Sequence, residues 1–228
     1  KPQSRSDPLV PVHIGSTALH YGQAAFEGLK AFQCQDGKIR IFRPELNAKR
    51  INKACHRICM PEIPESLFLE AINRAIEENV EYMPPYGTGG ALYIRPVVFG
   101  SGARIGLQPA DHYTFAVLVL PVSDYYRAGW TPVPAVIVED FDRAAPRGVG
   151  NVKVAGNYAA DILPNMSAKK KGFPIALYLD SKTNTHIEEF STSNFIAFTE
   201  NNEYVTPRSD AILESITNLS LMDLALDE

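Results

Sequence analysis

The sequence contains few of the residues that mark specialised protein classes. Its 228 residues include three cysteines and one tryptophan, and no apolar run approaches the length of about 20 residues that a membrane helix needs. An odd number of cysteines without zinc-type spacing favours a reducing compartment over a secreted disulfide scaffold. The formal net charge of −4 argues against a nucleic-acid surface. We therefore expect a cytoplasmic globular protein, or a mitochondrial one if a targeting segment precedes Lys1, with neither nucleic acid nor membrane as a partner.

Strand-like and helix-like patterns alternate along the chain, which predicts an α/β protein with mixed sheets. Polar, glycine and proline residues interrupt the pattern at 123–134. We interpret this stretch as the connection between an N-terminal domain, residues 1–122, and a C-terminal domain, residues 135–228. The expected elements are helices at 43–60, 66–83 and 157–172, strands at 90–100, 113–122, 135–140 and 175–180, a hairpin at 28–42 around the turn at 35–38, and a hairpin-like pair within 186–207.

Lys153 is unusual because apolar residues surround it on both sides. Val152, Val154 and Ala155 flank it, and the sequence Gly-Asn-Tyr follows at 156–158. One interpretation is a lysine whose stem packs on apolar neighbours while its amine reaches water. The other is a Schiff-base lysine that attacks a carbonyl, because desolvation lowers the pKa of an amine and leaves part of it neutral. The stretch by itself leaves both interpretations open.

The rest of the chain offers partners for one carbonyl cofactor, pyridoxal phosphate. The cofactor phosphate requires an arginine and the N–H groups of a helix start, which Arg50 and the sequence Ser-Ile-Thr-Asn at 215–218 can supply. The ring nitrogen requires a carboxylate, and Glu188 and Glu189 precede a turn rich in serine and threonine. The phenolic oxygen requires a hydroxyl donor such as Tyr158. Each demand of the cofactor therefore has a candidate residue.

Six sequence blocks follow the order and spacing typical of one enzyme family. They are ALHYGQAAFEGLKAF at 18–32, IFRPELNAKRI at 41–51, LYIRP at 92–96, VGNVKVAGNY at 149–158, EEFSTSNF at 188–195 and TPRSDAILESIT at 206–217. With these blocks the chain resembles the fold-type IV pyridoxal-phosphate aminotransferases, and specifically the branched-chain amino-acid aminotransferases. The resemblance covers nearly the whole chain and implies a two-lobe fold that holds the cofactor between its lobes and works as a homodimer. It also implies ping-pong transfer of the amino group of leucine, isoleucine or valine to 2-oxoglutarate.

The resemblance implies a role for each matching residue. Lys153 would bond covalently to the cofactor and then move the proton of the substrate α-carbon. Tyr158 would hydrogen-bond the phenolic oxygen of the cofactor, and Glu189, rather than Glu188, would pair with the pyridine nitrogen. The matching phosphate ligands are Arg50 and the backbone N–H groups of Ile216 and Thr217. The residues at substrate-pocket positions are Tyr21, Phe26, Gly28, Tyr93 and Arg95, and those on a loop that would enter the pocket of the partner subunit are Ile105 and Leu107.

Several of these residues have a plainer interpretation. Tyr21, Phe26 and Tyr93 could be core aromatics, and Arg50 could lie on the surface of an amphipathic helix. Arg95 is more informative, because it lies in an otherwise apolar strand and a buried guanidinium needs an anionic partner. A substrate carboxylate could be that partner.

Some positions depart from the family pattern. Glu214 stands where proline is usual, and its charge would oppose a phosphate unless it points to solvent. Glu188 is expected to face outward, because adjacent strand residues point to opposite sides. Asn194 is interpreted as a turn former or as a residue that supports the site. The family's later Gly-Thr turn, which helps bind the phosphate and the substrate carboxylate, has no counterpart up to Glu228. We therefore expect either further residues or an incomplete site.

Two other functions remain open at this point. One is a different enzyme on the same fold, such as a D-amino-acid or amine transaminase or an aminodeoxychorismate lyase, which the intact blocks at 26–32 and 93–96 make less favourable. The other is a non-catalytic relative with a scaffold role. The complete set of Lys153, Tyr158 and Glu189 argues against it.

Overall fold

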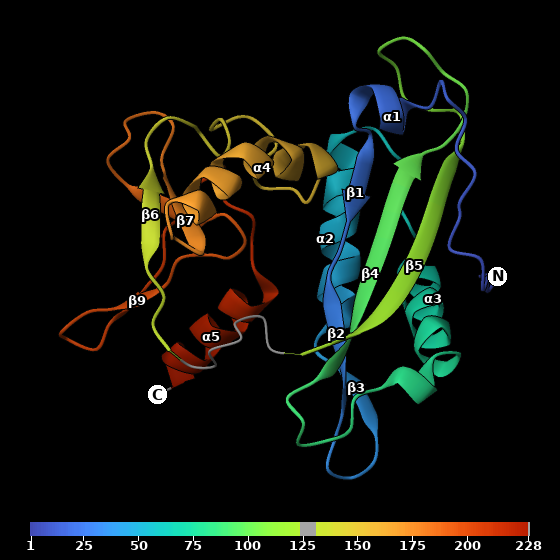
Figure 1. Ribbon diagram of the computed structural model, residues 1–228, viewed down its shortest axis with the longest axis horizontal. Coiled ribbons are helices and arrows are strands. Elements are labelled where there is room, and N and C mark those ends of the chain that lie inside the picture. Colours follow the sequence, from blue (N-terminus) through green and yellow to red (C-terminus); the bar gives the residue numbers. More distant parts are fainter. Residues whose placement is uncertain (124–130, 228) are drawn as a thin grey trace. The chain divides into compact units, whose positions relative to one another are not determined.

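The computed structural model describes residues 1–123 and 131–227, and its contacts divide the chain into two compact units, Lys1–Trp130 and Thr131–Glu228 (Figure 1). Each unit combines helices with a sheet, which confirms the predicted α/β class. Most of the expected connection at 123–134 lies outside the described residues. None of the helices in the described part of the chain has both the length and the apolar character that crossing a membrane requires.

An antiparallel sheet forms the centre of the first unit. Its elements are α1 (Thr17–Tyr21), β1 (Ala24–Phe26), β2 (Leu29–Gln33), β3 (Ile39–Ile41), α2 (Pro44–Arg57), α3 (Glu65–Glu77), β4 (Ala91–Gly100) and β5 (Tyr113–Val122). β4 pairs with β5 along its whole length on one edge, and with β1 and β2 on the other. β2 also pairs with β3, which confirms the hairpin expected around the turn at 35–38.

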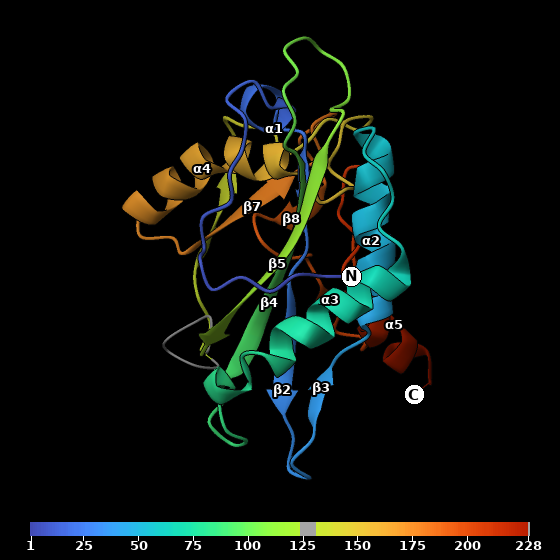
Figure 2. The ribbon, with the colours of Figure 1, turned by 90° about the vertical axis from the view of Figure 1, so that its right-hand side faces the viewer.

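The two faces of this sheet differ in burial. Leu92, Ile94 and Val98 alternate along β4 and point to the face that α2 and α3 cover (Figure 2). On that face Phe68 of α3 is fully buried and stacks on Phe115 of β5, with ring centroids 6.1 Å apart. Because side chains alternate across a strand, the intervening residues of β4 point to the opposite face. That opposite face carries several of the predicted site residues.

Helix α3 is shorter than the apolar pattern at 66–83 predicted. α3 ends at Glu77 instead of continuing to Met83, and a short 3-10 turn follows at Val80–Tyr82. The side chain of Asn79 donates a hydrogen bond to the carbonyl of Ala75 (2.9 Å). This bond satisfies one of the carbonyl groups that every helix end leaves without an intrahelical partner, and it accounts for the early stop.

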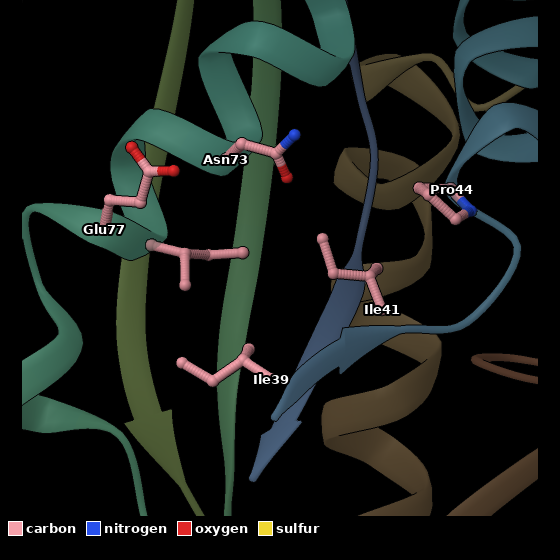
Figure 3. A pocket seen from close by; sticks show the side chains of 6 residues that line it. Ile39, Ile41, Pro44, Asn73 and Glu77 are labelled. Carbon is pink, nitrogen blue, oxygen red and sulfur yellow. The ribbon is translucent and has the colours of Figure 1, made fainter. Parts of the chain in front are cut away.

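A pocket of ≈ 320 Å³ lies between β3, the start of α2 and the last turns of α3 (Figure 3). Asn73 and Glu77 contribute polar groups from α3, while isoleucines of β3 form the apolar wall (Figure 3). The full lining is Ile39, Ile41, Pro44, Asn73, Ile76 and Glu77. None of these residues is among the predicted site residues.

The second unit is built on a smaller, mixed sheet. Its elements are β6 (Ala135–Val138), α4 (Ala155–Lys170), β7 (Ile175–Leu179), β8 (Ile187–Phe190), β9 (Ala197–Phe198), β10 (Tyr204–Val205) and α5 (Ile216–Asp227). β7 runs parallel to β6 and antiparallel to β8, and α4 packs on β7 around Ala168, Ala176 and Tyr178. The hairpin-like pair expected within 186–207 is divided: β8 joins this sheet, whereas β9 and β10 pair with each other.

Candidate active site

Lys153 lies in the turn that leads into α4 of the second unit. Its neighbours Val152 and Val154 are buried, at 2% and 4% exposure, as the apolar sequence predicts. The side chain of Asn157 donates hydrogen bonds to the carbonyls of Val149 (2.8 Å) and Val152 (3.1 Å), which hold the turn in place. α4 then begins at Ala155. The lysine is therefore presented by an ordered turn at a helix start.

Tyr158, one turn into α4, lies directly beside the lysine. The Lys153 amine donates a hydrogen bond of 2.7 Å to the Tyr158 hydroxyl, and the amine nitrogen lies 4.9 Å from the centroid of the tyrosine ring. Both side chains are half-buried. The structure thus brings together the two residues expected to hold the reactive carbon and the phenolic oxygen of one ring.

Glu189 of β8 is a buried carboxyl group, at 3% exposure. Arg143 lies 2.8 Å from its Oε1, to which the backbone N–H of Leu213 also donates (3.0 Å), and the side-chain amide of Asn194 donates to its Oε2 (3.1 Å). Burial raises the pKa of Glu189 to about 7, because desolvation outweighs the Arg143 charge and the hydrogen bonds that favour the ionised form. Asn194 therefore holds one oxygen of the Glu189 carboxyl group.

Arg143 is a site residue that the sequence did not reveal. Besides its contact with Glu189, its guanidinium donates to the carbonyls of Ala211 (2.8 Å) and Gly150 (3.4 Å). It thereby joins the carboxylate strand to the segment that leads to Lys153. A Cβ at Gly150 would come within 2.1 Å of the Ala211 carbonyl oxygen, so this close approach requires glycine. The only available signal was chemical: a buried carboxylate needs a cation, and arginine is the usual choice.

Glu188 was predicted to face outward, but it is buried, with 5% of its surface exposed. The hydroxyl of Ser209 donates to its Oε1 (2.7 Å), while its Oε2 has no hydrogen-bond partner among the described residues. Adjacent strand residues do face opposite sides, as expected, but the segment at 209–213 contacts both sides of β8: Ser209 reaches Glu188, and Leu213 reaches Glu189. The expectation was wrong because strand alternation gives direction and not exposure.

The start of α5 leaves two backbone donors available. The N–H of Asn218 donates to the Ser215 hydroxyl (3.2 Å), which confirms the expected hydroxyl cap. Within the described part of the chain, the N–H groups of Ile216 and Thr217 have no acceptor. Such first-turn donors, with the positive end of the helix dipole, favour an anion. Glu214 is exposed, so its charge is solvated.

In the first unit, Arg50 is held by a carboxylate rather than lying on the helix surface. It projects from α2, and its Nε lies 2.7 Å from Oε1 of Glu27, which has 0% exposure. The Arg50 side chain is 15% exposed. The predicted phosphate arginine is therefore a partly buried, oriented cation.

Phe26, Gly28, Tyr93 and Arg95 lie together on the side of the first sheet opposite α2 and α3. The Arg95 guanidinium carbon lies 4.5 Å from the centroid of Phe26, and Nη2 donates to the Tyr93 hydroxyl (2.8 Å). Its buried Nε has no hydrogen-bond acceptor among the described residues. A Cβ at Gly28 would come within 2.4 Å of the Tyr93 hydroxyl oxygen. The cluster thus combines an apolar ring with a guanidinium whose buried N–H lacks an acceptor.

Tyr21 belongs to a different part of the first unit. Its hydroxyl accepts a hydrogen bond from the backbone N–H of Gly106 (2.9 Å) and so fixes the tip of the loop between β4 and β5. Ile105 and Leu107, on either side of that glycine, are 77% and 86% exposed. Arg104 anchors the base of the loop through its bonds to Asp111. The loop therefore presents two apolar side chains from a braced backbone.

The fold and these residue clusters agree with one enzyme class, and comparison identifies the family. Residues 24–228 match the family model described as amino-transferase class IV, so the chain belongs to this family. This confirms the resemblance expected from the six sequence blocks.

Individual relatives agree with the family. The chain is similar to the branched-chain-amino-acid aminotransferases of Haemophilus influenzae (45% identical over 225 residues, 96% of this chain and 65% of the relative) and Helicobacter pylori (47% over 221 residues, 96% and 65%). It therefore spans about 65% of the length of these curated relatives.

Solved structures agree with the fold. The chain is similar to the branched-chain aminotransferase of the thermophilic archaeon Thermoproteus uzoniensis with norvaline, with a TM-score of 0.81 and 25% identity over 96% of this chain and 70% of that one. It is also similar to a branched-chain amino acid aminotransferase solved with pyridoxamine 5'-phosphate, with a TM-score of 0.82 and 25% identity over 100% of this chain and 71% of that one. These likenesses confirm the predicted fold-type IV architecture.

Proposed function

We propose that this protein is a pyridoxal-phosphate-dependent aminotransferase that moves the amino group of leucine, isoleucine or valine to 2-oxoglutarate. The observation that carries the proposal is the 2.7 Å hydrogen bond between the Lys153 amine and the Tyr158 hydroxyl, in a chain of the class IV aminotransferase family. Two relatives at 45% and 47% identity bear the name of branched-chain-amino-acid aminotransferase. The two half-reactions would form a ping-pong cycle that yields a 2-oxo acid and then glutamate.

Residues of the second unit fit the cofactor group by group. Lys153 offers an amine for its carbonyl carbon, Tyr158 a hydroxyl for its phenolic oxygen, and Glu189 a carboxylate for its ring nitrogen. The N–H groups of Ile216 and Thr217 at the start of α5 suit its phosphate. When bound, pyridoxal phosphate supplies a ring that withdraws electrons from the substrate α-carbon and carries the amino group between the two half-reactions.

Lys153 is the base of the proposed reaction. Its amine would take the proton from the substrate α-carbon and hold it as an ammonium until it is returned. Tyr158 accepts a hydrogen bond from this amine at 2.7 Å and so fixes its position. Val152 and Val154 are buried on either side of the lysine, and the lysine side chain itself is half-buried. The local fold thus holds the amine beside Tyr158.

Glu189 controls the proton of the ring nitrogen. Arg143 and Asn194 fix the two oxygens of Glu189, which as an ionised carboxylate would keep a proton on the ring nitrogen. The positive ring would in turn favour the ionised form of Glu189 against burial, which raises its pKa to about 7. A protonated ring attracts electrons from the α-carbon more strongly than a neutral one. The expected role of Glu189 is therefore electrostatic.

The cluster on the first unit suits two kinds of side chain. The ring of Phe26 offers an apolar surface for leucine, isoleucine or valine. Arg95, with its unsatisfied Nε, offers an N–H donor to the side-chain carboxylate of glutamate or 2-oxoglutarate. Tyr93 holds the guanidinium in place at 2.8 Å. We therefore expect this cluster to accept both an apolar and an acidic substrate side chain.

We also propose a homodimer in which the loop carrying Ile105 and Leu107 covers the substrate pocket of the partner subunit. The support is their exposure of 77% and 86% on a loop that Tyr21 and Arg104 hold in a defined shape. Both side chains flank Gly106, whose positive φ of 122° suits only glycine. A braced loop with exposed apolar tips is suited to a preformed partner surface.

A substrate panel tests the proposed function. The purified protein is supplied with pyridoxal phosphate, 2-oxoglutarate and one amino donor at a time, and glutamate is measured. Leucine, isoleucine and valine are expected to be the fastest donors, and Lys153→Ala to abolish all activity. Faster reaction with D-alanine or with a simple amine would favour another enzyme of this fold. Absence of glutamate with every donor would contradict the proposal.

A further inference from the structure

Glu27 is a fully buried carboxylate whose oxygens all have partners. It lies in the turn between β1 and β2, at 0% exposure. Oε1 accepts from Arg50 Nε (2.7 Å), and Oε2 accepts from Arg50 Nη2 (2.8 Å) and from the side chain of Asn47 (2.8 Å). The N–H of Gly28 also donates to Oε2 (3.2 Å). Removing a charge from water is costly, so such a residue calls for an explanation.

The contact with Arg50 is bidentate and therefore directional. Two parallel N–H···O bonds fix the plane of a guanidinium as well as its position. Asn47, one turn earlier on α2, holds the carboxylate from the side of the helix, while the backbone N–H of Glu27 donates to the carbonyl of Pro96 in β4 (2.8 Å). Glu27 is thus fixed between the sheet and the helix, and its two bonds to Arg50 restrict the conformation of the arginine side chain.

The same carboxylate connects two parts of the proposed site. Through Nε and Nη2 it orients the arginine expected to bind the phosphate. Through the N–H of Gly28 it holds the residue that lies against Tyr93 in the substrate cluster. One buried side chain therefore sets the geometry of both.

We propose that Glu27 is a positioning residue that orients Arg50 toward the phosphate of the cofactor, an inference that rests on the proposed function. Arginine has a long side chain with many rotamers, and binding a ligand immobilises them. Glu27 removes this freedom before the cofactor arrives. Its negative charge opposes the phosphate, but it lies behind the guanidinium, and we infer that orientation outweighs this repulsion.

The test compares cofactors with and without the phosphate. Apoprotein is titrated with pyridoxal phosphate and with pyridoxal, and each Kd is measured by absorbance. Glu27→Gln should raise the Kd for pyridoxal phosphate by about 10- to 100-fold, a loss of the size seen when a residue that orients a metal ligand is removed. Its Kd for pyridoxal should be unchanged. The matched control is Glu45→Gln, in the first turn of α2. It makes the same change of a glutamate to glutamine, and it should change the Kd of neither pyridoxal phosphate nor pyridoxal.

The possible outcomes separate the two proposals. If the wild-type protein does not prefer pyridoxal phosphate to pyridoxal, both the proposed function and the role of Glu27 are overturned. If the wild type shows this preference and Glu27→Gln retains it or strengthens it, only the role of Glu27 is wrong. An equal loss of affinity for both cofactors would also overturn it, because it would indicate general damage to the site.

A second variant covers the case in which Glu27→Gln fails to fold with an unpaired Arg50 charge. The double variant Glu27→Gln/Arg50→Met removes both members of the buried pair and leaves no charge without a partner. If Glu27 acts through Arg50, the double variant should lose the phosphate preference to the same extent as Arg50→Met alone. A further loss in the double variant would show that Glu27 acts by another route. Thermal melting and circular dichroism of each variant establish that it is folded.

Discussion

Gly28→Ala is the substitution whose effect follows most directly from the geometry of the substrate cluster. A Cβ at this position would lie 2.4 Å from the hydroxyl oxygen of Tyr93 and 3.2 Å from its Cζ. Since ordinary contacts begin near 3.4 Å, the tyrosine ring must retreat by about 1 Å. That movement breaks the 2.8 Å hydrogen bond from Arg95 to the Tyr93 hydroxyl. The substitution thus changes the position of the Arg95 guanidinium through Tyr93, without a direct contact between the added methyl group and Arg95.

The expected magnitude follows from the bond that is lost. A hydrogen bond to a charged group contributes about 1.5–3 kcal/mol, which corresponds to about a 10- to 100-fold change in rate. If Arg95 binds the side-chain carboxylate, this loss should fall on glutamate and 2-oxoglutarate. Leucine, whose side chain would contact Phe26, should lose less. The ratio of kcat/KM for leucine to that for glutamate should therefore rise by at least about tenfold.

Single-turnover half-reactions measure this ratio, because each amino donor is followed separately by the absorbance of the bound cofactor. The matched control is Gly156→Ala on α4, where nothing lies within 4 Å of the added Cβ. It should leave both rates unchanged and slightly raise the melting temperature, because alanine is the better helix former. Equal losses for leucine and glutamate in Gly28→Ala, or no loss for glutamate, would refute the assignment of the carboxylate to Arg95.

Four further predictions concern the remaining site residues. Lys153→Ala should abolish the visible absorption of bound cofactor and nearly all transamination while leaving the circular dichroism spectrum unchanged; wild-type turnover would contradict its role. Glu189→Gln should bind cofactor but lose turnover by orders of magnitude, whereas Glu188→Gln should have a mild effect, and equal effects would show that the strand was misassigned. Burial raises the pKa of Glu189 from 4.5 to about 7, so the folded state binds the proton more tightly and the wild type should lose about 3 kcal/mol of stability as pH rises from 4.5 through 7. Denaturant titration across this range should show that Glu189→Gln removes the dependence, and an unchanged slope would disprove its origin. The double variant Ile105→Ala/Leu107→Ala should lose selectivity for leucine, while its turnover of glutamate should change less. Hybrid dimers of one such subunit and one Lys153→Ala subunit should contain one wild-type-like site. Isolated hybrids without leucine selectivity would contradict the shared pocket.

The sequence alone determined those features that depend on neighbours in the chain. The Gly-containing turn at 35–38 predicted the β2–β3 hairpin, and the apolar residues on either side of Lys153 are buried, as their composition indicated. The capping of α5 by Ser215 was equally local. The order of the six blocks identified the family, because each block retains its own residues and spacing.

Only the tertiary structure decided which distant groups meet and which of them lose water. Arg143 is 46 positions from its partner Glu189, and no local pattern indicates such a pair. The segment at 209–213 contacts Glu188, and the side chain of Asn79 bonds to the end of α3. The spacing of apolar residues predicts neither contact. The raised pKa of Glu189 likewise depends on desolvation by residues remote in sequence. The physical reason is that direction along a strand or helix is a local property, whereas burial and charge pairing depend on the packing of elements that the chain brings together from far apart.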